Sequence, residues 1–306
     1  MDALAATLLS VVTAATPLLL AATGELVVER SGVLNLGVEG MMLTGAVAGF
    51  AVLAAGGAPA VAVAAAALAG AALALLFGLL TLTLLANQVA SGLALTIFGI
   101  GLSALLGAEL VGTPVERLPR LSLAGLSELP LVGPLLFGQD PLVYLALAVL
   151  GLTAWTLRHT HLGRVIRACG DDHEAAHALG YPVIAVRYGA VLFGGAMAGL
   201  AGAYLSLVYT PMWAEGMTAG RGWIALALVV FSAWRPGRLL VGALLFGGVT
   251  ILQLHAQALG LFAVPAQLLS MLPYLATILV LALLAGGLRR RSEAPACLGK
   301  PFRPPA

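Results

Sequence analysis

Charged residues are scarce in this chain, at 9% of 306 residues against about 25% in a typical soluble domain. Hydrophobic residues make up 61%, and the mean hydropathy is +1.04. Apolar runs repeatedly reach the roughly 20 residues that a helix needs to cross a bilayer. This composition excludes a water-soluble enzyme, a disordered protein and an outer-membrane barrel, whose strands alternate polar and apolar residues. It predicts an all-α bundle of transmembrane helices.

Cysteine and lysine are almost absent. The two cysteines, Cys169 and Cys297, form no CxxC pair and fall in segments that we assign to the cytoplasm, so we expect free thiols. The single lysine, Lys300, precedes Pro301, whereas a phosphate-binding P-loop requires Gly-Lys-Ser/Thr. We therefore expect no ATP hydrolysis by this chain. An energy source, where one is used, must be a partner chain or an ion gradient.

The apolar runs and the breaks between them predict nine membrane spans. Their approximate limits are 3–23, 34–56, 60–85, 88–110, 141–157, 187–210, 221–234, 238–258 and 265–287. The seventh falls short of the ~17 residues of a minimal span, which indicates a broken or tilted helix.

Basic residues are distributed unevenly over the two sides of this topology. Twelve of the 15 fall on one side and three on the other. The richer side holds Arg30, the loop 158–187, the turn 235–238 and the C-terminal tail; the poorer side holds Arg117, Arg120 and Arg221. Because lysine and arginine favour the cytoplasmic side, we predict an outer N-terminus and a cytoplasmic C-terminus.

Two segments outside the spans are rich in proline. The loop 111–140 on the outer side carries four prolines, which predicts an ordered but largely non-helical excursion. The tail 292–306 also carries four, and we expect it to be disordered. The prediction is one transmembrane domain over 1–291, followed by a disordered cytoplasmic tail over 292–306.

Polar side chains within or next to the spans are the first candidates for function, because such groups are costly in a bilayer. The candidates are Asn35, Glu39, Asn87, Gln88, Glu215 and Trp223. Asn35 and Glu39 are four residues apart and share one face of a helix. We expect Glu39 to be buried and paired, in a structural or a pathway-lining role. Glu25, Glu29 and Arg30 are interpreted as interfacial caps and helix-end ion pairs.

A short repeat links two of these regions. Residues 38–41 (VEGM) recur as residues 214–217 (AEGM), and the topology places the two copies near opposite membrane faces. An inverted-topology repeat, which is common among transporters, would have this arrangement.

The cytoplasmic loop contains two overlapping motifs that indicate different proteins. His173-Glu174-x-x-His177 matches HExxH, in which two histidines on one helix face hold zinc and the glutamate is a general base. The extended form has a third histidine where this chain has Val183, and catalytic zinc normally takes three protein ligands. A zinc protease is therefore the weaker interpretation, and we expect neither a metal site nor catalytic residues.

The second motif, EAAHALG at residues 174–180, resembles the EAA-x-x-x-G loop of ABC-importer permeases. We predict a short helix over about 171–179, with Asp171 or Asp172 as its N-terminal cap. Gly180 can end this helix in a left-handed turn, and Pro182 prevents its continuation. The two alanines keep one side of the helix slim, so that it can lie in a groove on a partner. A solvated turn helix without a partner is the alternative.

The resemblance extends beyond this loop. Residues 24–50, with SGVLNLGVEGMM at 31–42, look like the second-span signature of permeases of the ribose/branched-chain amino acid superfamily. Residues 199–227 resemble the sixth-to-seventh connection of the same family. Within it, the chain is most similar to nucleoside and simple-sugar permeases, and the similarity covers most of residues 24–285.

This resemblance implies the permease subunit of a bacterial ABC importer in the cytoplasmic membrane, translocating nucleosides or a simple sugar. Such a subunit works with an ABC ATPase, a second permease subunit and an extracytoplasmic solute-binding lipoprotein, and needs no cofactor or nucleic acid. The residues expected to couple to the ATPase are Gly170, Asp171, Asp172, Glu174, Ala175, Ala176, Leu179 and Gly180. Asn35 and Glu39, then the other polar candidates above, are expected near the solute path. The alternative within transport is a gradient-driven carrier in which Glu39 carries protons.

Overall fold

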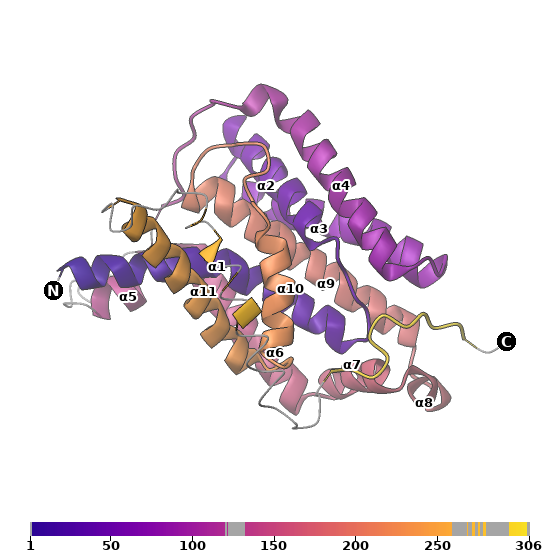
Figure 1. Cartoon of the computed structure of the whole chain (residues 1–306). Coiled ribbons are helices and arrows are strands. Elements are labelled where there is room, and N and C mark those ends of the chain that lie inside the picture. Colours follow the sequence, from indigo (N-terminus) through magenta and orange to yellow (C-terminus); the bar gives the residue numbers. More distant parts are fainter. Residues whose placement is uncertain are drawn as a thin grey trace.

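The computed structural model describes residues 2–119, 121, 132–258 and 294–304, with isolated positions between 268 and 279. All the secondary-structure elements formed by these residues are helices, as predicted (Figure 1). The long helices are α1 (Asp2–Arg30), α2 (Val38–Ala54), α3 (Pro59–Gly78), α4 (Gln88–Gly107), α6 (Pro141–His159), α9 (Val183–Tyr204) and α11 (Pro236–Ala258). The shorter ones are α5 (Val132–Phe137), α7 (His161–Asp171), α8 (His173–Ala178) and α10 (Arg221–Phe231). Short turns of other helix types extend α3 over Leu79–Thr83, α4 over Ala108–Leu110 and α9 over Leu205–Tyr209.

Six of the described helices are long and apolar enough to cross a membrane. They cover Ala5–Arg30, Pro59–Thr83, Gln88–Leu110, Pro141–His159, Val183–Tyr209 and Pro236–Ala258. The second and seventh predicted spans are instead the partial helices α2 and α10, of 17 and 11 residues. Hydropathy cannot distinguish a helix from apolar extended chain, and residues 34–37 of the second predicted span are not helical. Residues 31–33 and 211–220, which lie between predicted spans, are not helical either. The ninth predicted span, 265–287, lies outside the described residues except for isolated positions.

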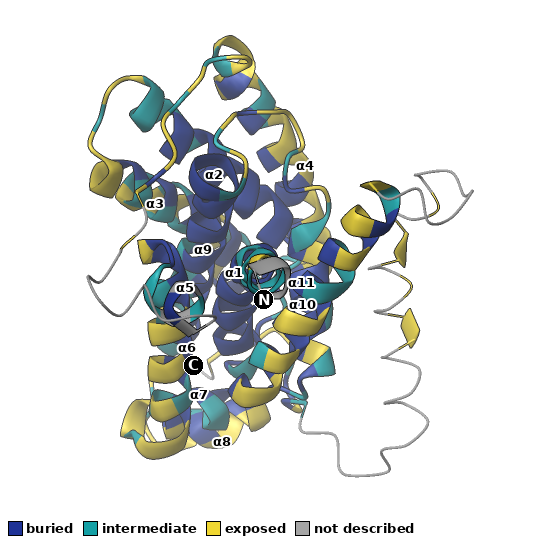
Figure 2. Cartoon of the chain, turned by 90° about the vertical axis from the view of Figure 1, so that its left-hand side faces the viewer, coloured by how far each residue is buried: buried dark blue, intermediate teal, exposed yellow. Residues whose placement is uncertain are grey.

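The centre of the bundle is α9, around which α1, α2 and α3 pack (Figure 2). In the most apolar 18-residue stretch of α9 and its extension, 83% is buried in the protein. The corresponding fraction is 33% in each of α3, α4 and α6. The outer faces of α4 and α6 expose large apolar side chains such as Ile97, Leu105 and Trp155. Apolar surfaces of this extent suit contact with lipid.

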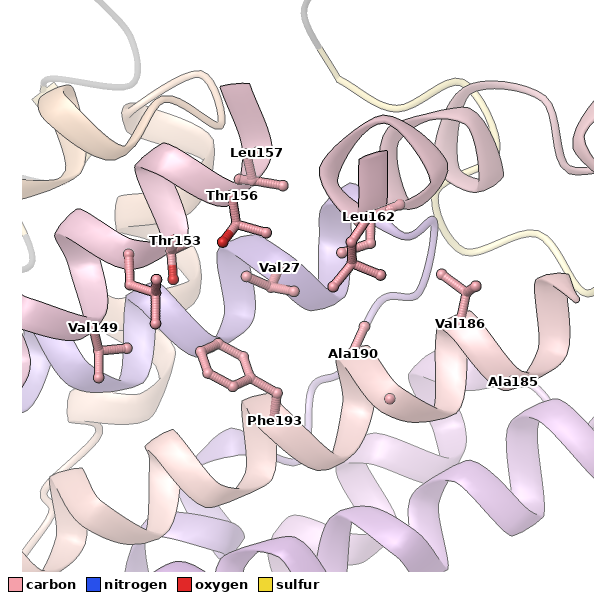
Figure 3. Close-up of a pocket in the computed structure, with 13 residues that line it drawn as sticks. Val27, Val149, Thr153, Thr156, Leu157, Leu162, Ala185, Val186, Ala190 and Phe193 are labelled. Carbon is pink, nitrogen blue, oxygen red and sulfur yellow. The ribbon is translucent and has the colours of Figure 1, made fainter. Parts of the chain in front are cut away.

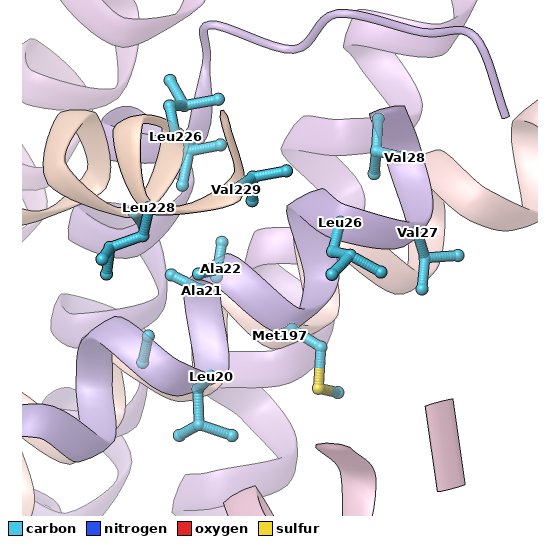
Figure 4. Close-up of a cluster of buried hydrophobic side chains, with 14 of the residues drawn as sticks. Leu20, Ala21, Ala22, Leu26, Val27, Val28, Met197, Leu226, Leu228 and Val229 are labelled. Carbon is cyan, nitrogen blue, oxygen red and sulfur yellow. The ribbon is translucent and has the colours of Figure 1, made fainter. Parts of the chain in front are cut away.

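Aliphatic side chains join α1 to its neighbours in the core (Figure 4). Leu26 and Val28 of α1 are fully buried, together with Leu228 and Val229 of α10 and, nearly so, Met197 of α9. Because lipid is as apolar as these side chains, moving them out of lipid gains little. Dispersion energy from close packing must hold the helices together instead.

Glycines allow α9 to approach α2 and α3 at backbone distance. A Cβ on Gly199 would overlap the carbonyl oxygen of Ala66 on α3, and a Cβ on Gly45 of α2 would overlap Gly199 itself. Gly195 precedes Gly199 by four residues, in a GxxxG pattern, and lies equally close to Gly70. The pair therefore serves helix packing inside the bundle, as its sequence pattern indicates.

Gly199→Ala is expected to destabilise the protein, because the added methyl group pushes α9 away from α3. Overpacking of this kind costs about 1–3 kcal/mol. Gly189→Ala is the matched control in the same helix, since a Cβ there meets no atom within 4 Å and alanine favours helix. Thermal unfolding in mild detergent should give a lower midpoint for Gly199→Ala than for Gly189→Ala. Equal midpoints would contradict the close packing.

Candidate functional site

One end of the bundle gathers arginines from four separate segments. Arg30 of α1, Arg158 of α6, Arg167 of α7 and Arg235 line one recess together with Trp234. Arg30 donates from Nε and Nη2 to the Trp234 carbonyl, at 3.3 and 3.0 Å. The prediction that these basic segments share one side of the bundle is therefore confirmed.

Two helices, not one, occupy the middle of the 158–187 loop. The prediction of a single helix over 171–179 is wrong in its start, because α7 ends at Asp171 and α8 begins at His173. Asp172 separates them with extended backbone. Its Oδ1 accepts hydrogen bonds from the amides of Glu174 and Ala175, at 3.1 and 3.0 Å. Asp172 is thus the N-terminal cap of α8, one of the two residues predicted for this role.

The end of α8 is fixed by the predicted glycine. Gly180 has a φ of +86°, and its amide donates to the His177 carbonyl at 2.8 Å. The Tyr181 amide donates to the Ala176 carbonyl at 3.1 Å. Together these bonds form a Schellman motif, which ends a helix through a left-handed glycine. Hydrogen bonds at both ends therefore fix where this six-residue helix begins and ends.

The helix α8 presents most of the predicted coupling residues to solvent. The exposed ones are Asp171, Asp172, Glu174, Ala175, Leu179 and Gly180. Leu179 is 76% exposed, although it is apolar. Gly170 and Ala176 are instead buried, and a Cβ on Gly170 would overlap the Arg30 carbonyl oxygen. The surface that a partner can reach is therefore the acidic and leucine-bearing face of α8.

The HExxH residues have structural roles in this fold. His173 is buried, and its Nδ1 accepts a hydrogen bond from Arg187 Nη2 at 3.1 Å, since a guanidinium can only donate. Burial and the Arg187 charge lower the pKa of His173 and favour its neutral form. Zinc here would lie beside a guanidinium, and the described residues bring no third His, Cys, Asp or Glu to the pair. This geometry disfavours the zinc protease.

The C-terminal tail is ordered over residues 294–304, contrary to the predicted disorder of 292–306. The Cys297 amide donates to the Gly170 carbonyl at 2.8 Å, and the Gly299 amide donates to the Gly32 carbonyl at 3.0 Å. Figure 1 shows this segment, in yellow, beside α7. Its prolines suggested disorder, but they equally suit an extended segment whose other amides find partners on the bundle.

Phe302 attaches this tail to α8. It is 5% exposed, and its ring centroid lies 4.9 Å from that of His173 and 5.5 Å from that of His177. Both histidines of the HExxH motif therefore pack on one aromatic ring of the tail. The contact was not predictable from local sequence, because 125 or more residues separate the partners.

Arg187, in the first turns of α9, joins four segments at this end and was missed as a site residue. Its side chain is 1% exposed. Besides the bond to the imidazole, Nε donates to the Ser31 carbonyl at 3.0 Å, Nη1 to that of Lys300 at 3.3 Å and Nη2 to that of Cys169 at 3.4 Å. The available signal was that Arg187 is the only charged residue in the predicted span 187–210.

The non-helical segment 31–37, between α1 and α2, is held by side chains. The Leu34 amide donates to Gln88 Oε1 at 2.8 Å, and the Asn35 amide donates to Glu25 Oε1 at 3.3 Å. The Gly37 amide donates to Asn35 Oδ1 at 2.9 Å. The Thr96 hydroxyl donates to the Leu36 carbonyl at 2.9 Å. Buried backbone outside a helix needs such partners for its polar groups. Asn35 and Gln88, predicted near the solute path, therefore support this segment.

The second non-helical segment, 210–220, leads into α10, whose N-terminus is held by Glu39 of α2. Glu39 is 6% exposed. Its Oε1 accepts from the Thr218 hydroxyl and the Gly220 amide at 2.6 and 2.7 Å, and its Oε2 accepts from the Gly222 amide at 2.6 Å. The carboxylate satisfies orphan amides and opposes the positive end of the helix dipole. Glu39 is therefore buried and paired, as predicted.

The remaining predicted path residues, Asn87, Glu215 and Trp223, are exposed. Asn87 is exposed and caps α4, accepting from the Ala90 amide at 3.0 Å. Glu215 is exposed in the 210–220 segment, and Trp223 is exposed in the first turn of α10.

Glu25 and Glu29, interpreted from the sequence as interfacial caps or helix-end ion pairs, are buried inside the protein near the C-terminal end of α1. Each is 1% exposed. Glu29 Oε2 accepts from the indole Nε1 of Trp234 at 2.6 Å, and Glu25 accepts from the Asn35 amide. With i, i+4 spacing, the two carboxylates share one face of α1 and hold the segments that flank α2 and α10.

The fold and its polar junctions define a polytopic membrane protein of the transporter permease class, in which partial helices end inside the bundle and an exposed helix projects from one end. Residues 7–287 match the family model of the branched-chain amino acid transport system permease component. The chain belongs to this family.

Three relatives are similar along most of the chain. TsgC13 of Haloferax volcanii, provisionally named a glucose ABC transporter permease protein, is 44% identical over 292 residues, covering 89% of each chain. The guanosine ABC transporter permease protein NupQ of Bacillus subtilis is 31% identical over 304 residues, covering 94% of this chain and 93% of NupQ. The nucleoside ABC transporter permease protein NupC of Lactococcus lactis is 30% identical over 286 residues, covering 89% of each. This chain is accordingly an ABC transporter permease.

Glu39→Ala is expected to lower the free energy of unfolding by about 3 kcal/mol, because it leaves buried amides at the start of α10 without an acceptor. Glu215→Ala is the matched control, since Glu215 lies in the repeat copy and is exposed. Denaturation in mild detergent measures both. A Glu39→Ala protein as stable as Glu215→Ala would contradict the structural role of the carboxylate.

Proposed function

We propose that this chain is the membrane-spanning subunit of an importer that carries a neutral, hydroxyl-rich solute, a nucleoside or a simple sugar, across the cytoplasmic membrane. ATP hydrolysis takes place on a separate ABC ATPase that contacts α8 from the cytoplasm, where the C-terminus also lies. A second permease subunit and an extracytoplasmic solute-binding lipoprotein complete the transporter. The main support for the proposal is that α8 is a short helix with both ends capped and one face exposed.

Mechanical coupling needs a surface helix that a partner can push without deforming it. The Asp172 cap and the Gly180 turn fix both ends of α8, and Phe302 packs behind it. From α8, the His173–Arg187–Ser31 contacts lead directly to the non-helical segment before α2. A push on α8 is thereby transmitted to a place where the bundle is not a continuous helix.

The choice of a neutral solute follows from how the buried charges are used. Glu25, Glu29, Glu39 and Arg187 each hold backbone or side-chain partners within the chain. Gln88 differs, because its buried Nε2 has no partner among the described residues. It also lines a recess of about 250 Å³ with Asn87. These amides suit hydroxyl and base groups, and the relatives named for glucose, guanosine and nucleosides indicate the same class.

Solute uptake tests this proposal directly. The chain is purified with its bound partners, reconstituted in vesicles with the binding protein, and supplied with labelled guanosine or glucose and with ATP or ADP. We expect accumulation of one of the two solutes with ATP only, and no loss of uptake on adding a protonophore. Uptake that needs a proton gradient and no ATP would overturn the proposal in favour of a gradient-driven carrier.

Gly180→Val is expected to reduce the ATPase bound to the purified permease, because a β-branched residue with a positive φ distorts the end of α8. Left-handed backbone costs a non-glycine residue about 1–2 kcal/mol, and asparagine tolerates it best. A Cβ at position 180 meets no atom within 4 Å, so the effect is one of backbone conformation alone. Gly180→Asn should therefore retain most binding. If Gly180→Val bound as much ATPase as the unchanged protein, the docking role of α8 would be contradicted.

A further inference from the structure

The C-terminal tail makes a turn between its contacts with the bundle. The Lys300 amide donates to the Cys297 carbonyl at 3.0 Å, and Gly299 inside this turn has a φ of +74°. Glycine adopts such left-handed backbone at no steric cost. A Cβ on Gly299 would meet no atom closer than 3.9 Å, so the constraint here is the backbone conformation and not the space. The tail is thus a shaped segment, and the turn sets where Phe302 lies.

Hydrogen bonds attach the tail to three parts of the bundle. Before the turn, the Cys297 amide donates to the Gly170 carbonyl in the last turn of α7, at 2.8 Å. Within the turn, the Gly299 amide donates to the Gly32 carbonyl of the first non-helical segment, at 3.0 Å. The Arg187 guanidinium of α9 donates to the next carbonyl of the tail, at 3.3 Å. One short segment therefore connects the end of α7, the start of α9 and the backbone that precedes α2.

Phe302 extends this connection to α8. Its ring contacts the imidazoles of His173 and His177, which share one face of α8. A helix of six residues is too short to be stable alone, so its orientation depends on the side chains packed against it. Phe302 is the largest member of the buried apolar cluster at this end of the bundle. The other members are Val165 and Cys169 of α7, Ala176 of α8 and Val183 of α9.

A neighbouring flank of α7 is packed less closely. A groove of about 540 Å³ lies there, with walls from α6, α7 and α9 (Figure 3). Leu162 of α7 lines it together with Val149 of α6 and with Ala190 and Phe193 of α9. Side chains that face one another across a groove lose dispersion contacts, so they hold α7 less firmly. The cluster around Phe302 is therefore important for the position of α7 and α8 on α9.

We infer that Phe302 is a positioning residue for α8, and that the tail makes α8 and the first non-helical segment move together. The inference rests on the proposed contact between α8 and the ATPase. One connection from α8 to this segment runs through Arg187. The tail supplies a second, from Phe302 on α8 to the bond between Gly299 and Gly32. Two connections resist tilting of so short a helix better than one does.

Reconstituted transport tests this inference with four variants of the full chain. Phe302→Ala removes the ring. Phe302→Tyr keeps it, and the recess of about 460 Å³ that Phe302 helps to line has room for the added hydroxyl. Arg303→Ala changes the exposed neighbour and is the matched control. Gly299→Val keeps Phe302 but strains the turn, and it is the second test of the tail if Phe302→Ala does not fold.

Each variant is purified with its bound partners and reconstituted with the binding protein. The measured quantities are the ATPase bound per permease, the ATP hydrolysed and the labelled guanosine or glucose accumulated. We expect Phe302→Ala to retain its ATPase, because the exposed face of α8 is unchanged. Its uptake per ATP hydrolysed should fall roughly 2- to 30-fold, the range in which single side chains change the coupling between sites. Gly299→Val should do the same, whereas Phe302→Tyr and Arg303→Ala should keep the ratio of the unchanged protein.

Three results would overturn the inference. The first is an unchanged ratio in Phe302→Ala, or in Gly299→Val where Phe302→Ala does not fold. The second is an equal loss in Arg303→Ala, which would exclude a specific role for the ring. The third is loss of the bound ATPase in Phe302→Ala, which would make the tail part of the docking surface. Failure of the proposed function is distinct from these, because the unchanged protein would then carry no ATPase or would take up solute without ATP.

Discussion

Buried backbone polar groups that lie outside a helix must have hydrogen-bond partners, and this requirement organises the interior of the protein. Two segments, 31–37 and 210–220, interrupt the helical bundle. Glu25, Asn35, Gln88 and Thr96 hold the first, and Glu39 holds the start of α10 after the second. The polar residues that are most conspicuous in so apolar a sequence are therefore largely structural. Their hydrogen bonds stabilise the backbone before the partial helices α2 and α10, whose polar groups hydrophobic burial cannot satisfy.

The same constraint connects the interior of the bundle to the exposed end. Ser31 and Gly32, at the start of the first non-helical segment, bind Arg187 and the Gly299 amide. Arg187 in turn binds His173 at the start of α8. An external helix, an ordered tail and a non-helical segment thus share one buried guanidinium. In a subunit that receives force from a partner, this is a short and stiff connection to the least regular part of the bundle.

Much of this arrangement was predictable from composition and local rules. Hydropathy gave the all-α class and the six long helices, and capping rules gave Asp172 and Gly180, because both depend on residues close in sequence. The break at 210–220 falls between the predicted spans 187–210 and 221–234. Residues 34–37 were instead assigned to a span, since an apolar residue is compatible with helix and with extended chain. The order of the tail depends on Gly32 and Gly170, which are more than 120 residues away, and the role of Arg187 depends on four segments that only the fold brings together.

Side chains hold the two non-helical segments in fixed hydrogen bonds. Residue-resolved hydrogen–deuterium exchange of the purified protein tests this most directly, on the amides of Leu34, Asn35, Gly220 and Gly222. The account predicts protection of these amides close to that of the α9 core, and fast exchange at the neighbouring exposed Gly216. Exchange of the four amides as fast as that of Gly216 would contradict it.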